Sequence, residues 1–212
     1  MVMNQKSNQR AATKQAFLTA LEGELVSGRA LTVEAIAGRA QANKALVYRY
    51  FGGLSGLLAA YAADDQFMPS AAELRALCDP NLDALPPRVR FAQCVTACVA
   101  ALAKRPATVQ ILLRLPSFDP PTLAALREGR ARGIADIRQA FGASDSGLGF
   151  DSELAFNLLI AGVCQILGAR RLSWLHEETE LPELVASVSR TVRGLLIPPS
   201  AGNDREGEGR QR

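Results

Sequence analysis

The feature that most constrains the fold is a pair of short helices joined by a three-residue turn within residues 32–51. Thr32 is placed to cap the first helix, because its hydroxyl can accept a hydrogen bond from a free backbone N–H group. Asn43 is placed to cap the second helix, which ends at Gly52 and Gly53. Two helices of two turns each, joined in this way, predict a helix-turn-helix.

The second helix of this motif carries two different faces. Val47 and Phe51 are four residues apart, so they share the side that points inward. Lys44, Tyr48 and Arg49 project away from that side. A short helix that displays cations and tyrosines is poorly suited to a core and well suited to a groove of double-stranded DNA.

The rest of the chain predicts an all-α protein with about nine helices and no strands. Of the 212 residues 48% are hydrophobic and 6% aromatic. Leu and Ala dominate, and runs with a period of two residues are few, which favours helices. The expected helices are 7–27, 32–40, 43–51, 54–77 as one or two, 87–104, 106–115, 122–141, 151–172 and 181–196. The pattern predicts three parts: residues 7–53 with the helix-turn-helix, a helical body at 54–198, and a disordered tail at 199–212.

The charge is distributed unevenly between these parts. The whole chain carries +3, whereas residues 1–52 hold seven basic and three acidic side chains. The first quarter therefore carries +4 and the remainder −1. This asymmetry is expected if the first quarter meets a polyanion and the rest does not.

The chain has no apolar N-terminal segment of the kind that directs secretion, so we expect a cytoplasmic protein. The longest apolar stretch, residues 154–168, is interrupted by Asn157 and Gln165. At 1.5 Å per residue it is too short for a ~30 Å hydrocarbon core. We therefore expect a buried helix and no membrane partner.

No residue pattern indicates an enzyme, a metal site or a cofactor. His176 is the single histidine, and it is expected in a solvated loop or at a helix end. The four cysteines lie in apolar helical sequence, which is typical of buried small hydrophobes in a reducing compartment. Cys94 and Cys98 share a helix face, so a thiol sensor or a soft-metal site remains an alternative.

Residues 31–58, LTVEAIAGRAQANKALVYRYFGGLSGLL, resemble the helix-turn-helix signature of the tetracycline-repressor (TetR) family of bacterial regulators. The match covers roughly residues 10–60. It implies a small core formed by Ile36, Ala37, Ala40, Val47 and Phe51. It also implies DNA contacts from Thr32, Asn43, Lys44, Ala45, Leu46, Tyr48, Arg49 and Tyr50.

Two positions depart from the family pattern. The turn usually has glycine where this chain has Gln41, so Gln41 must adopt a conformation that glycine adopts more easily, or the turn must tilt. The next helix usually begins with a lysine that holds a phosphate, and Leu54 stands there instead. Loss of this cation is expected to lower the salt dependence of DNA binding by roughly one unit. Leu46 offers an apolar contact to a thymine methyl group.

The resemblance also implies that residues 7–53 bind DNA and that residues 54–198 form a dimer interface and a ligand cavity. The expected dimer interface consists of Leu154, Leu158, Ala161, Ile166, Leu184, Val188, Val192 and Leu195. The candidate ligand pocket consists of Phe91, Cys94, Val95, Cys98, Val109, Leu112, Leu113, Ile134, Phe156 and Leu159. Arg114, Arg127, Arg130 or Arg138 would add an anchor for an anion, and Trp174 would cover the interface or the core.

The sequence therefore predicts a homodimeric repressor that a small molecule of unknown identity releases from a palindromic DNA operator. Two-fold symmetry would place the two recognition helices in major grooves about one helical turn or more apart. Two alternatives remain open: a transcriptional activator of the same fold, and a helical small-molecule-binding protein whose DNA binding is weak.

Overall fold

The computed structural model describes residues 2–141, 148–170 and 178–197. In these ranges the chain forms ten α-helices and no strand. The helices are α1 (Val2–Val26), α2 (Val33–Arg39), α3 (Ala45–Phe51), α4 (Leu54–Ala62), α5 (Ala71–Ala76), α6 (Pro87–Ala103), α7 (Pro106–Arg114), α8 (Pro120–Phe141), α9 (Ser152–Ala169) and α10 (Leu181–Leu196). Short 3₁₀ turns lie at Leu82–Ala84 and Leu115–Ser117. The all-α expectation is confirmed, and the segment 54–77 forms two helices.

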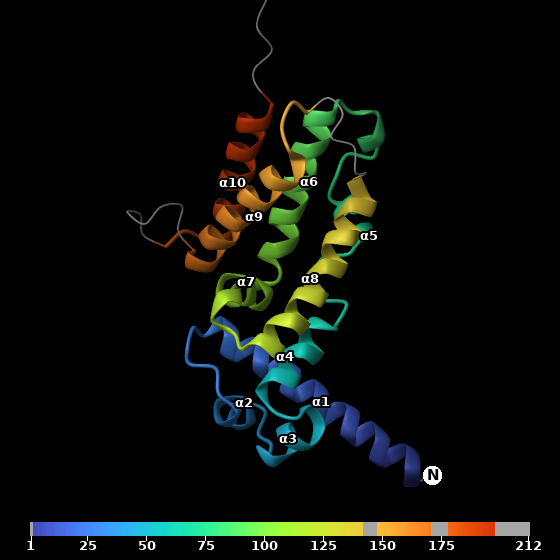
Figure 1. Ribbon diagram of the computed structural model, residues 1–212, viewed down its shortest axis with the longest axis vertical. Coiled ribbons are helices and arrows are strands. Elements are labelled where there is room, and N and C mark those ends of the chain that lie inside the picture. The colour runs from blue at the N-terminus through green and yellow to red at the C-terminus, as the bar shows by residue number, and fades with distance from the viewer. Residues whose placement is uncertain (1, 142–147, 171–177, 198–212) are drawn as a thin grey trace, which may run out of the picture.

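Helices α1 to α3 form the lower end of the molecule in Figure 1, with α2 and α3 beside the long α1. Phe17, Ile36 and Val47 come from the three helices and are fully buried together. The ring of Phe51 meets that of Phe17 edge to face, with the centroids 6.2 Å apart. This burial explains why two helices of only seven residues are stable here, since isolated helices of that length do not form in water.

Glu24 interrupts the apolar pattern of α1, and the structure shows why. Its side chain is buried and accepts a hydrogen bond from Nε of Arg39 on α2, at 2.7 Å. A carboxylate removed from water in this way requires a partner charge. The pair therefore ties α2 to α1.

The remaining helices form the upper body, in which α6 runs through the centre between α9, α10 and α8 (Figure 1). Pro87 and Pro106 stand in the first turns of α6 and α7, where a missing N–H group costs nothing. Asp119 accepts a hydrogen bond from the N–H of Thr122 at the start of α8. Asp151 caps α9 through the N–H of Leu154.

Helix α4 links the lower part to the upper body, because it contacts α3 and packs against α8, and α1 also packs against α7. The two backbones approach so closely at Gly129 that an added Cβ would lie 2.5 Å from the carbonyl oxygen of Ala62. Arg132 donates to the same oxygen at 2.9 Å. The apolar cluster that contains Phe17 and Val47 also contains Leu126 of α8, so one core crosses the predicted boundary at residue 53.

Some sequence-based expectations concern residues outside the described ranges. They are His176, Trp174, most of the loop at 142–149 and the tail at 199–212.

Candidate functional site

The exposed face of α3 consists of Lys44, Ala45, Tyr48 and Arg49. The Tyr48 side chain is 56% exposed although Tyr is large and partly apolar. Val47, on the opposite side of the helix, is fully buried. The face therefore offers two cations and a phenol hydroxyl to a partner, and these are the donors that contact phosphates and base edges in a DNA groove.

Leu46 and Tyr50 lie on the flank of α3 and are half-buried against the N-terminal core. The guanidinium of Arg10 lies over the Tyr50 ring, 5.3 Å from its centroid. The ammonium of Lys14 lies 5.7 Å from the centroid of the Phe51 ring. Leu46 and Tyr50 therefore contribute to packing as well as to the edge of the exposed face.

Arg10 and Lys14 are additions that the sequence analysis did not place at this site. The sequence signal that was available is their spacing of four residues, which puts both cations on one side of α1. Their partners, Tyr50 and Phe51, are some 40 residues away in sequence, so the spacing alone does not show that this side meets α3. Together they extend the positive surface from α3 onto α1.

Thr32 and Asn43 hold the starts of the two motif helices. The Thr32 hydroxyl oxygen accepts from the N–H of Ala35 at 3.1 Å, as a helix cap does. The side-chain oxygen Oδ1 of Asn43 accepts from the N–H of Ala45 at 2.8 Å. Both side chains are exposed, and the Thr32 hydroxyl and the Asn43 amide keep hydrogens that a phosphate oxygen can accept.

Lys44 has a partner within the chain. Its Nζ lies 3.0 Å from Oε1 of Glu34 on α2, and both side chains are more than half exposed. The hydrogen bond lowers the pKa of Glu34 and raises that of Lys44, so both remain charged at neutral pH. In water such a pair is weak, and a phosphate can compete with Glu34 for the ammonium.

The two departures from the family pattern have structural explanations. Gln41 has φ of 50°, so the turn does place a non-glycine residue in the left-handed region. Leu54 is half-buried and packs against the N-terminal core, where a lysine would have to bend away. The chain therefore replaces a charge at the start of α4 with apolar packing.

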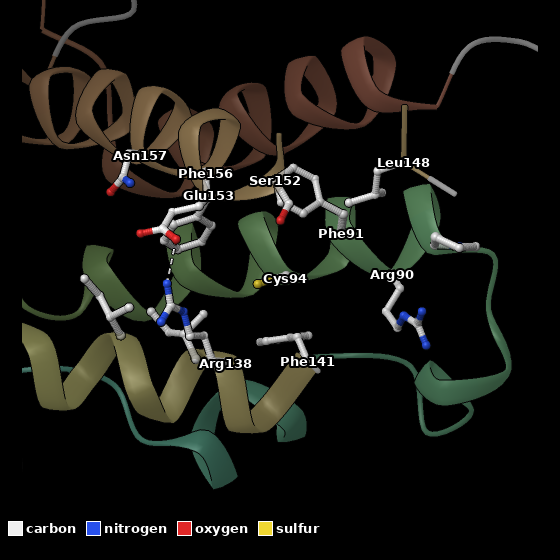
Figure 2. A pocket seen from close by; sticks show the side chains of 13 residues that line it. Arg90, Phe91, Cys94, Arg138, Phe141, Leu148, Ser152, Glu153, Phe156 and Asn157 are labelled. Atoms are coloured by element: carbon white, nitrogen blue, oxygen red, sulfur yellow. Dashed lines mark hydrogen bonds and ion pairs between the residues drawn. The ribbon is translucent and has the colours of Figure 1, made fainter. Parts of the chain in front are cut away.

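Two cavities lie between α6, α8 and α9. The smaller has a volume of about 240 Å³ and is shown in Figure 2. Phe91, Cys94 and Phe156 line its floor, and Arg138 of α8 reaches Glu153 of α9 across it, at 2.7 Å. The larger cavity has a volume of about 330 Å³ and extends toward α7.

The two cavities adjoin, because four residues line both of them. These residues are Ile134, Ile137, Phe156 and Asn157. Of the predicted pocket residues, Phe91 and Cys94 line the smaller cavity, Cys98, Leu112 and Leu113 line the larger, and Ile134 and Phe156 line both. Val95, Val109 and Leu159 line neither and pack in the core of the upper body.

The predicted dimer residues divide into two groups. Leu154, Leu158 and Leu195 are 57%, 66% and 70% exposed, and Ala161 is exposed as well. Ile166 is half-buried against the core of its own chain. The prediction is wrong for Leu184, Val188 and Val192, which are at most 6% exposed in a single chain. They face α6, so they leave no surface for a second copy.

Helix α9 is long and strongly apolar, and most of it is not buried within one chain. By length and composition alone its 18 residues, with mean hydropathy 1.5, suffice to cross a membrane, although the apolar stretch 154–168 within it is too short by itself. Only 17% of the helix is buried. A helix with this composition requires a second apolar surface beyond the one its own chain provides.

Cys78, Cys94 and Cys164 lie in environments that keep their thiols protonated. Burial raises the pKa of Cys78 and of Cys164 to about 11. A hydrogen bond with Cys98, together with burial, raises the pKa of Cys94 well above its ordinary value. The thiolate is the reactive form, so this environment argues against a thiol sensor. Among the described residues, no group of three or more His, Cys, Asp and Glu side chains could hold a metal ion.

Comparison with known proteins agrees with this arrangement. Residues 29–61 match the family model of the bacterial regulatory proteins of the tetR family. A search among curated proteins finds no significant match. Among solved structures, a TetR-like transcriptional regulator from Rhodococcus sp. RHA1 is similar, with 20% identity and a TM-score of 0.56, over 87% of this chain and 96% of that one.

Two further structures extend the likeness. The TetR family regulator PfmR from Thermus thermophilus has 15% identity and a TM-score of 0.59, over 89% of this chain and 97% of that one. The fatty acid degradation regulator FadR from Bacillus halodurans has 14% identity and a TM-score of 0.55, over 87% and 96%. Residues 29–61 thus match the tetR family model of bacterial regulatory proteins, and the chain as a whole has the fold of the TetR-family transcriptional regulators.

Proposed function

We propose that this protein is a cytoplasmic, homodimeric transcriptional regulator that binds an operator in double-stranded DNA and responds to a small molecule. The observation that carries the proposal is the exposed face of α3. It presents Lys44, Tyr48 and Arg49 to solvent within a segment that matches the tetR family model. Each subunit places α3 in a major groove, and two-fold symmetry requires an operator that is nearly palindromic.

The apolar face of α9 supports the dimer. Leu154, Leu158 and Ala161 are exposed at spacings of four and three residues, so they form one stripe along the helix. Leu195 of α10 is exposed as well. A second copy that covers these side chains would remove apolar surface from water at about 25 cal/mol per Å².

A polar substitution in the stripe tests this interface. Leu158→Glu places a charge in the surface that the second copy covers, so we expect a monomer by analytical ultracentrifugation. Glu183→Gln, at an exposed position of α10, serves as the control and should leave the dimer intact. A Leu158→Glu protein that sediments as the wild type does would show that α9 is not the interface.

The position of the cavities supports a response to a ligand. Ile134 and Ile137 of α8 line both cavities, and α8 also holds α4, the helix that follows α3. A ligand that prefers one position of α8 therefore biases the position of α4 and the separation of the two α3 helices. The ligand can change the DNA affinity by at most the factor by which its own affinities for the two positions of α8 differ.

Repression is the simplest outcome, because a dimer on a promoter excludes other proteins from it. Activation by the same fold would give the opposite change in reporter expression when the regulator is deleted. A ligand-binding protein with weak DNA binding is favoured by one observation, the missing cation at Leu54. The extension of the positive surface to Arg10 and Lys14 argues against it.

The direct test is the affinity of the purified protein for its own upstream DNA over a series of salt concentrations. We expect a specific complex whose affinity falls steeply with salt, and we expect Lys44→Ala with Arg49→Ala to abolish it. Each phosphate contact that is lost lowers the salt slope by about 0.9. Arg75→Ala removes a cation from α5, away from α3, and should bind as the wild type does (Figure 1). Intact binding by the double variant would refute the proposal.

A further inference from the structure

The larger cavity contains a cation without a counter-ion among the described residues. Arg130 of α8 lines this cavity and is half-buried. Its hydrogen-bond partner is a neutral one: the guanidinium donates to Oδ1 of Asn157 at 3.3 Å. A guanidinium that has lost part of its water is stabilised by a carboxylate, which it can bind through two parallel hydrogen bonds.

The arginine that α8 places in the smaller cavity differs in this respect, while Arg90 of α6 also lines that cavity. The arginine of α8, Arg138, already pairs with Glu153 at 2.7 Å, as Figure 2 shows, so that charge is compensated within the chain. Of these two arginines of α8, Arg130 is therefore the one available to an anion. Asn157 lines both cavities and its side-chain amide can donate a further hydrogen bond to the same anion.

The rest of the larger cavity is lined mainly by aliphatic side chains and thiols. They include Leu102, Leu112, Leu113, Ile160 and the buried Cys98 and Cys164. Within the described parts of the chain, no lysine and no second arginine lines it. A volume of about 330 Å³ lies at the lower end of the range for small-molecule sites.

We infer that the larger cavity binds an aliphatic carboxylic acid, with its carboxylate on Arg130 and Asn157 and its chain among the leucines. This inference rests on the proposed function, since the acid would be the effector of the regulator. Arg130 follows Gly129, the residue at which α8 touches the backbone of α4. The charge of the acid is thus recognised at the level where α8 meets the helix that carries the DNA-binding part.

Calorimetry with the full chain tests the inference without DNA. The probes are octanoate and 1-octanol, which share the apolar chain and differ in the charge. We expect octanoate to bind at least tenfold more tightly than 1-octanol, and Arg130→Gln to lose at least tenfold in octanoate affinity with little change for 1-octanol. Arg130→Lys keeps the charge and should recover part of the loss. Arg127→Gln, at an exposed position of α8 outside both cavity linings, should bind as the wild type does.

Three outcomes would overturn the inference: equal affinity for the acid and the alcohol, an Arg130→Gln protein that keeps its octanoate affinity, or no binding of octanoate or decanoate at millimolar concentration. Circular dichroism confirms that each variant is folded. Octanoate binding by a chain that fails to bind its upstream DNA would support the acid site and refute the regulator. DNA binding without any acid binding would refute the acid site and support the regulator.

Discussion

The contact between α4 and α8 makes a quantitative prediction for Gly129→Ala. The new Cβ would lie 2.5 Å from the carbonyl oxygen of Ala62 and 3.1 Å from its Cβ. Ordinary contacts at a Cβ begin at 3.4 Å, so the oxygen would have to move by about 0.9 Å. The oxygen is also held by Arg132, which donates to it at 2.9 Å.

The cost follows from the rigidity of both partners. The carbonyl oxygen of Ala62 belongs to the backbone of α4, and the new Cβ is fixed to the backbone of α8. No flexible side-chain end can therefore turn aside. Extra methyl groups in well-packed sites cost about 1–3 kcal/mol, and the upper end applies here. Alanine recovers about 1 kcal/mol through its higher helix propensity. The net loss is then about 2 kcal/mol, which lowers the melting temperature of a chain of this size by roughly 4–8 °C.

The assay is thermal unfolding followed by circular dichroism at one protein concentration, since a dimer melts in a concentration-dependent way. Gly38→Ala is the matched control, because apart from its chain neighbours and its own helix backbone no described atom lies within 4 Å of the position its Cβ would take. We expect that control to melt at or above the wild-type temperature. A Gly129→Ala protein as stable as Gly38→Ala would show that α4 and α8 are not in backbone contact.

Three other changes test local features of the structure. Gln41 has φ of 50°, so Gln41→Gly should be more stable in guanidinium than Gln41→Val by about 1–2 kcal/mol, and equal stabilities would contradict the turn geometry. Arg105 lowers the pKa of Glu73 below its ordinary value of 4.5, so this pair stabilises the folded state above pH 4.5 and loses that effect as the pH falls through the lowered pKa. Glu73→Gln should therefore melt below the wild type at pH 7, and the gap should close in acid; a gap that stays constant with pH would refute the pairing. Glu34→Gln frees Lys44 for phosphate and should tighten DNA binding in fluorescence anisotropy, whereas weaker binding would mean that Glu34 orients Lys44 productively.

Local signals predicted the helix-turn-helix well because its determinants are close in sequence. Thr32 caps α2 through an N–H group three residues away. Gln41 takes the positive φ that a residue at a glycine position must take. These features depend on hydrogen bonds and torsions within a few residues, and such features can be read from a single sequence.

The orientation of α10 could not be read in this way. An apolar stripe with Leu184, Val188 and Val192 shows that one face of the helix is covered. It does not show whether α6 of the same chain or a second copy covers it. The structure assigns that stripe to α6 and leaves Leu195 and the Leu154 face of α9 uncovered.

The residues that line the cavities were predicted only in part, for a related reason. Apolar side chains at helical spacing can line a cavity or fill a core, and the sequence pattern is the same in both cases. Which of the two they do depends on how far the helices diverge. Val95 and Val109 were indistinguishable in sequence from Cys98 and Leu113, yet they pack in the core of the upper body. The choice of Arg130 among four arginines likewise required the position of each charge relative to Glu153 and Asn157.

The glycines of α8 also determine how a ligand signal would travel in the proposed regulator. At Gly129 the backbones of α8 and α4 meet directly, and at Gly133 an added Cβ would collide with Cβ of Met68, in the segment after α4. A contact between backbones cannot be absorbed by a change of side-chain rotamer, whereas a contact between long side chains can. A displacement of α8 by a ligand at Arg130 must therefore move α4 or break the contact. Helix α4 follows α3 after only Gly52 and Gly53, so a movement of α4 shifts the recognition helix α3. In a dimer, a shift of the two α3 helices changes the separation that the operator must match.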